Sequence, residues 1–90
     1  ALLQHENALV NYWAATLIGR MGAEASECQQ ALAKLITSSS DLAAKERAVW
    51  ALTQVEANSD EAIAALESAM ESGQPRLSRL AKEALSELPR

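Results

Sequence analysis

The sequence predicts an all-α fold, and three observations point to it. The 90-residue chain contains only three Gly and two Pro, so few positions interrupt a helix. Aromatic residues are scarce, because the chain has two Trp, one Tyr and no Phe, which leaves a core of Ala, Leu, Ile, Val and Met. No stretch alternates apolar and polar residues between turn dipeptides, as a β-hairpin would. We therefore expect an all-α domain of about five helices.

The first half of the chain predicts two helices. The opening "ALLQH" is typical of the end of a preceding helix. Asn7 is a suitable N-cap for a helix over residues 8–21, and Gly22 stands where a left-handed residue closes a helix. A second helix is expected over residues 26–37. The polar run "SSSD" at 38–41 then supplies a turn and the next N-cap.

The second half predicts three more helices. One is expected over residues 42–56, before the break "ANSD". Ser59 or Asp60 caps the next helix, and Gly73 ends it. A proline is favoured in the first turn of a helix, so the fifth helix is expected over residues 75–88.

Similar stretches recur along the chain. "NYWAATLIGRM" at 11–21 resembles "RAVWALTQV" at 47–55 with a shift of 35 residues, and less closely "RLAKEALSEL" at 79–88. Two leucine series follow this spacing: Leu17, Leu52 and Leu85, and Leu32 and Leu66. A two-helix unit cannot bury both of its apolar faces alone, so such units stack on their neighbours. Six small residues are expected to permit close packing between the units: Ala14, Ala15, Ala48, Ala51, Ala81 and Ala84.

The recurring stretches resemble the HEAT repeat family. "ERAVWALTQV" and "RLAKEALSEL" share an A-x-x-A-L pattern typical of a first helix, and "EAIAALESAM" resembles a second helix. The family's usual first-helix proline is missing around Val49, and its turn aspartate has a counterpart only at Asp60. The resemblance implies antiparallel helix hairpins stacked as a short right-handed α-solenoid. It also implies one domain over residues 1–90, with repeats at 7–37 and 41–72 and a half repeat at 74–88. We expect this domain to be part of a longer protein.

Two other architectures compete with this interpretation. "NSDEAIAALESAMESGQP" also resembles the second helix of a tetratricopeptide repeat, although Trp50 stands where that family needs a small residue. A helical bundle without repeats is the other alternative.

The residues that carry chemistry are few and scattered. His5 is the single histidine and Cys28 the single cysteine, and neither has a neighbouring base or second ligand in the sequence. Cys28 is expected to be a small buried side chain on the second helix. Asp60 and Glu61 are placed to interact with the positive end of a helix dipole rather than to hold a metal ion. We therefore expect no enzyme activity, no cofactor and no metal.

The charge distribution indicates the class of partner. The net charge of −4 argues against binding of duplex nucleic acid, and no apolar run approaches the roughly 20 residues of a membrane span. Segments 24–37 and 59–72 together hold six acids and one Lys. The second helices of HEAT-like solenoids line the concave face, so the resemblance implies an acidic surface that recognises a basic protein or peptide. The alternative is an ordinary solvated face. The residues proposed for this surface are Glu27, Glu61, Glu67 and Glu71.

Three hydrophobic positions lead to separate predictions. Trp13 aligns with Ala48 under the 35-residue shift and is expected in the core. Trp50 is expected to be partly exposed or wedged against the helix that carries Tyr12, with a role as an interaction anchor as the second alternative. The last helix has apolar residues around much of its circumference, so either the protein continues beyond it or two copies meet there. We expect two copies to associate through Leu77 and Leu80.

These observations favour a non-catalytic protein-interaction or scaffolding module. Two alternatives remain: a regulatory or lyase-associated accessory subunit, suggested by fold analogy, and a structural helical bundle that dimerises.

Overall fold

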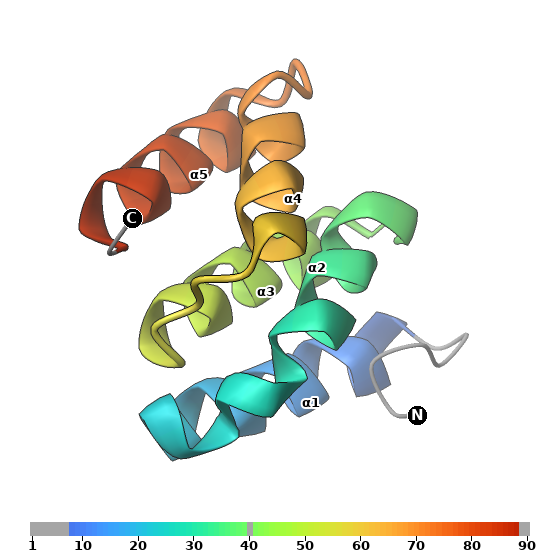
Figure 1. Ribbon diagram of the computed structural model, residues 1–90. Helices are drawn as coiled ribbons and strands as arrows, with labels where there is room; N and C mark the ends of the chain where they lie inside the picture. Colours follow the sequence, from blue (N-terminus) through green and yellow to red (C-terminus); the bar gives the residue numbers. More distant parts are fainter. Residues whose placement is uncertain (1–7, 40, 89–90) are drawn as a thin grey trace.

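The computed structural model describes residues 8–39 and 41–88, and these ranges contain helices and no β-strand (Figure 1). The all-α prediction is therefore confirmed. The helices are α1 (Ala8–Met21), the 3-10 helix η2 (Gly22–Cys28), α2 (Gln29–Ser38), α3 (Leu42–Gln54), α4 (Asp60–Met70) and α5 (Pro75–Glu87).

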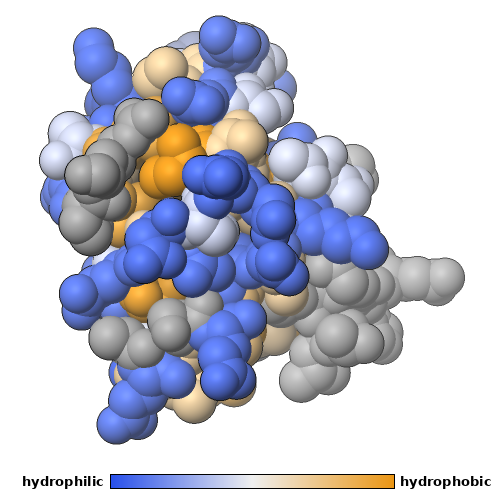
Figure 2. Space-filling model, in the orientation of Figure 1, coloured by the Kyte–Doolittle hydropathy of each residue, from blue (hydrophilic) through white to orange (hydrophobic). Residues whose placement is uncertain are grey.

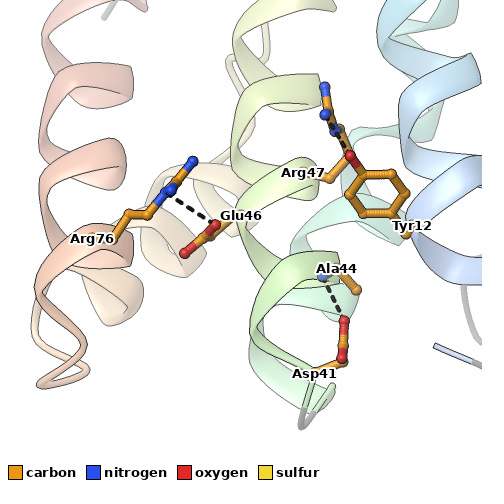
Figure 3. A network of polar contacts seen from close by, with 6 residues as sticks. All are labelled: Tyr12, Asp41, Ala44, Glu46, Arg47 and Arg76. Carbon is orange, nitrogen blue, oxygen red and sulfur yellow. Dashed lines mark hydrogen bonds and ion pairs between the residues drawn. The ribbon is translucent and has the colours of Figure 1, made fainter. Parts of the chain in front are cut away.

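Polar side chains start two of the helices where the sequence predicts. The Asp41 carboxylate accepts a hydrogen bond from the backbone N–H of Ala44 at 2.8 Å, which caps α3 (Figure 3). The Ser59 hydroxyl accepts one from the N–H of Ala62 at 3.1 Å, which caps α4. Each cap satisfies one of the N–H groups that a helix start leaves without a partner. The predicted N-cap Asn7 lies outside the described residues.

Glycine and proline close and open helices as predicted. Gly22 follows α1 with φ of 65°, and Gly73 follows α4 with φ of 83°. These left-handed conformations are costly for residues with a Cβ atom. Pro75 occupies the first turn of α5, where its missing N–H costs no hydrogen bond.

The second predicted helix differs from the structure. Residues 26–37 do not form one α-helix, because the chain first winds as η2 and becomes regular α-helix only at Gln29. Within η2, Ala25 has non-helical angles (φ −99°, ψ 21°) and is buried in the core. The kink turns this small residue inward, while Glu24 and Glu27 on either side stay exposed.

The helices form two layers. Helix α1 packs against α3, and α3 packs against α5; in the second layer α2 packs against α4. The layers are joined where α2 contacts α3 and α4 contacts α5 (Figure 1). This arrangement confirms the stacked helical hairpins of an α-solenoid.

One continuous core runs through the stack. Leu32 of α2 and Leu66 of α4 are both fully buried, as their 34-residue spacing predicts. The six small residues expected between the units are all buried as well: Ala14, Ala15, Ala48, Ala51, Ala81 and Ala84. Small side chains at these positions let the helix backbones approach closely.

The predicted register of the first helix is wrong by two residues. Trp13 is 55% exposed and Leu17 is 57% exposed, whereas their supposed counterparts Ala48 and Leu52 are fully buried. The buried Ala15 and Thr16 correspond instead to the buried Ala48 and Val49, a shift of 33 residues. Each residue rotates a helix by about 100°, so two residues turn it by about 200°. The 35-residue alignment therefore turns the expected face of α1 to the opposite side, which is why it wrongly predicts Trp13 in the core.

Candidate functional site

A groove lies between α2 and α4, the two helices of the second layer. Its volume is about 480 Å³. Its walls are Gln30, Ala33, Lys34 and Thr37 of α2 and Glu61, Ala64 and Ala65 of α4. Three of the seven side chains are alanine, so the space between the helices is left open.

The helical spacing of the lining residues places their side chains on the groove side of each helix. In α2, residues 30, 33, 34 and 37 recur every three or four positions and so share one edge of the helix, while Leu32, Leu35 and Ile36 are buried. In α4, Glu61, Ala64 and Ala65 line the groove while Leu66 and Ala69 pack in the core. Figure 2 shows that this side of the molecule is largely hydrophilic, with hydrophobic surface in small areas.

The four predicted acidic residues do not lie together in the structure. Glu61 alone among them lines the groove, where Lys34 contributes a positive charge from the facing helix. Glu27 lies in η2, Glu67 lies further along α4, and Glu71 is the C-cap of α4; all are exposed. Apart from Glu61, the acids of α4 thus form a charged surface beside the groove rather than its lining.

A second polar surface lies on the first layer, which α1, α3 and α5 form. The Arg47 guanidinium of α3 donates a hydrogen bond to the Tyr12 hydroxyl of α1 at 2.6 Å (Figure 3). The same guanidinium carbon lies 4.9 Å from the centroid of the Tyr12 ring and 5.0 Å from that of Trp50. Both distances are within the range of cation–π attraction. Arg47 therefore links the aromatic residues of two neighbouring helices.

Trp50 packs as a wedge between helices. It is half-buried on α3, and a Cβ atom built on Gly19 of α1 would lie 2.8 Å from its Cη2 atom. Only glycine leaves room for the ring at this position. The prediction that Trp50 wedges against the helix carrying Tyr12 is confirmed. Its role as an interaction anchor stays a prediction.

Two further grooves flank Trp50. The first, of about 330 Å³, lies beside Tyr12, Arg47 and Arg76, and Arg76 pairs with Glu46 at 3.3 Å (Figure 3). The second, of about 320 Å³, runs between α3 and α5 past Glu83 and Glu87. Both grooves include Glu46, Trp50 and Leu80 in their walls.

The last helix does not offer the apolar pair that the sequence predicts for self-association. Leu77 is 1% exposed and Leu80 is partly buried. Leu77, Ala81, Ala84 and Leu88 recur at four, three and four residues, so one face of α5 enters the core of the same chain. The expectation that Leu77 contacts a second copy is corrected, because this side chain is already covered.

The remaining candidate residues have structural roles or lie outside the structure. Cys28 is partly buried, packs against the core and precedes α2. His5 lies outside the described residues. In residues 8–39 and 41–88, no group of three or more His, Cys, Asp and Glu side chains is placed to hold a metal ion. Nor do these ranges contain a helix with the length and apolarity of a membrane span.

The structure also shows a contact that the sequence did not reveal. The side-chain oxygen of Gln29, at the start of α2, accepts hydrogen bonds from the backbone N–H groups of Asn58 and Ser59, both at 2.8 Å. Its amide nitrogen donates to the Asn58 side chain at 3.3 Å. Gln29 thus ties α2 to the turn before α4. Nothing local distinguishes this glutamine from its neighbour Gln30.

The two-layer stack of helical hairpins, with a groove along its second layer, defines an α-solenoid. Comparison with family models gives the family: residues 1–86 match the model of HEAT repeats. The chain belongs to the HEAT repeat family. Searches of curated proteins and of solved structures found no match.

Proposed function

We propose that this protein is a non-catalytic interaction module that holds a segment of a partner protein in the groove between α2 and α4. HEAT repeats commonly mediate contacts between proteins, and the family is typically non-catalytic. The observation that carries the proposal is the groove itself, about 480 Å³ in volume and open along two helices.

The shape and chemistry of the groove indicate the kind of segment it accepts. Ala33, Ala64 and Ala65 provide an apolar floor without bulk, so a narrow peptide backbone or small apolar side chains fit between the helices. Gln30 and Thr37 add hydrogen-bonding groups along the α2 side. Such a site combines an apolar surface with a few polar groups that set orientation.

The charges around the groove favour a basic partner. Helix α4 carries four exposed acids at its surface and C-cap and no basic residue: Asp60, Glu61, Glu67 and Glu71. Lys34 is the one cation in the groove wall. Surface charge of one sign steers a partner of the opposite sign and sets its orientation, and salt weakens this effect. We propose that Lys or Arg side chains of the partner lie along α4 while its apolar part enters the groove.

The test fills the groove and leaves the fold intact. Ala64 is exposed, so Ala64→Arg places a long side chain in the groove without entering the core. Ser86→Arg adds the same side chain and charge at an exposed position of α5 and serves as the matched control. The parent chain and both variants are immobilised, and proteins retained from a lysate of the source cells are quantified by mass spectrometry.

We expect a set of proteins retained by the parent and by Ser86→Arg, and reduced at least tenfold on Ala64→Arg. Retention should fall when the salt concentration rises from 50 mM to 500 mM, because the charges of α4 are exposed. Equal retention by Ala64→Arg would show that the groove is not the binding site. Retention that does not respond to salt would contradict the basic character of the partner.

A further inference from the structure

The first helix presents a row of large hydrophobic side chains on its outer side. Trp13, Leu17 and Met21 are spaced by four residues and are 55–57% exposed. Leu9 precedes them in the same row and is exposed too. We call Trp13, Leu17 and Met21 the α1 ridge. Residues four apart form a continuous ridge on a helix surface, which is the feature that packs into the grooves of another helix.

The position of the ridge in the repeat marks it as an interface. With the 33-residue shift established by the buried residues, Trp13 corresponds to Glu46 and Leu17 corresponds to Trp50. In α3, Glu46 pairs with Arg76 of α5, and Trp50 packs against Gly19 of the neighbouring helix α1. The same row of the repeat is therefore partly covered in α3 and exposed in α1.

The chemistry of α1 distinguishes this face from the rest of the molecule. Among its 14 residues, Arg20 is the only charged one, although the chain as a whole carries a net charge of −4. Two copies that approach through any acidic surface repel each other, whereas two α1 ridges meet without like charges in the row. Exposed aromatic residues at the centre of such a surface are typical hot spots of protein interfaces.

We propose that the α1 ridge is the contact between two copies of this chain, which pair their first helices about a two-fold axis. When the two-fold axis is perpendicular to the helices, the two ridges run antiparallel and each residue meets a partner on the other copy. The spacing makes the ridge self-complementary: an axis opposite residue 15 places Trp13 of each copy against Leu17 of the other. Both copies then cover their largest exposed side chains.

The size of the ridge is consistent with a weak dimer. The exposed parts of its side chains amount to on the order of 400 Å² per copy, about half of the roughly 800 Å² that each partner contributes to a standard interface. Such a dimer is weak and depends on concentration. Its dissociation constant is expected in the micromolar range.

Sedimentation equilibrium over a hundredfold range of concentration tests the contact. The parent is expected to shift from the monomer mass towards twice that mass as concentration rises. Leu17→Glu places a charge in the ridge at an exposed position and should stay monomeric throughout. Leu42→Glu makes the same substitution at a large exposed residue of α3, outside the ridge, and should dimerise like the parent.

A double variant tests the antiparallel pairing. Trp13→Lys alone should prevent dimerisation, as Leu17→Glu does. Trp13→Lys combined with Leu17→Glu should restore it at least partly at low salt, because each new lysine faces a new glutamate across the axis. A parent that remains monomeric, or a Leu17→Glu variant that dimerises as strongly as Leu42→Glu, overturns the proposal. If the double variant stays monomeric at low salt, the antiparallel arrangement is overturned.

Discussion

At the scale of single residues, the contact between α1 and α3 depends on one glycine and one tryptophan. Gly19 has no side chain, so the Trp50 ring occupies the space where a Cβ atom would lie. Arg47 covers the same ring and donates a hydrogen bond to Tyr12, which ties the two helices together. Gly19 is therefore used for close packing and not for an unusual backbone angle.

Replacing this glycine tests the packing. Alanine in a helix interior is favoured over glycine by about 1 kcal/mol. Overpacking against the Trp50 ring costs about 1–3 kcal/mol. We therefore expect Gly19→Ala to lower the free energy of unfolding by up to about 2 kcal/mol, measured by urea denaturation.

In a chain without the Trp50 ring, the same substitution should change the free energy of unfolding in the opposite direction. In a Trp50→Leu chain the ring is gone, so Gly19→Ala should raise the free energy of unfolding, by about 0.5–1 kcal/mol. The same loss in both backgrounds would mean that the Trp50 ring is not the obstacle.

At the scale of secondary-structure elements, the sequence predicts where helices begin and end better than which way they face. Ser59, Asp41, Gly22 and Pro75 act locally, and each marks a helix end in the structure. The face of a helix depends on rotation, and each residue of misalignment turns it by about 100°, so an alignment that is wrong by two residues reverses the predicted face. For this reason Trp13 was expected in the core and lies on the surface.

The candidate site was harder to predict than the fold. The sequence indicated the helices that carry the acids but not that Glu61 alone lines a groove with Lys34. This juxtaposition depends on how α2 and α4 pack across 27 residues of sequence. The self-association prediction failed at Leu77 because the same helical face can bind a second copy or the chain's own core, and periodicity does not distinguish the two.

The helix caps lead to a prediction at this scale. The side chains of Asp41 and Ser59 each accept a hydrogen bond from a backbone N–H of the first turn, whereas Gln74 precedes α5 without such a bond. We expect Asp41→Ala and Ser59→Ala each to lower the free energy of unfolding by about 1 kcal/mol. Gln74→Ala is the control and should change it little. Thermal and urea unfolding followed by circular dichroism measures the difference, and a Gln74→Ala loss equal to the others would contradict the assignment of the caps.

At the scale of the whole molecule, the repeats share one core. Buried residues form a continuous cluster from Ala14 of α1 to Leu88 after α5, so no boundary of exposed side chains separates the first hairpin from the second. Helix α3 contacts α1, α2 and α5, so it connects the first and the last helix of the stack. Repeat proteins gain stability from such contacts between neighbours.

The last prediction concerns the cooperativity of unfolding. Leu32 in α2 and Leu66 in α4 are fully buried in different hairpins, so Leu32→Ala and Leu66→Ala should each lower the free energy of unfolding by about 2–5 kcal/mol. Because the core is shared, each substitution should shift two signals equally: the fluorescence of Trp50 in a Trp13→Phe chain, and the helical circular dichroism of the whole molecule. The exposed position of Trp13 makes its replacement by Phe a mild change. In the Leu66→Ala chain, part of the helical circular dichroism could be lost at a urea concentration where Trp50 fluorescence is still that of the native protein. That result would mean that the second hairpin unfolds independently and that the continuous cluster does not act as one cooperative unit.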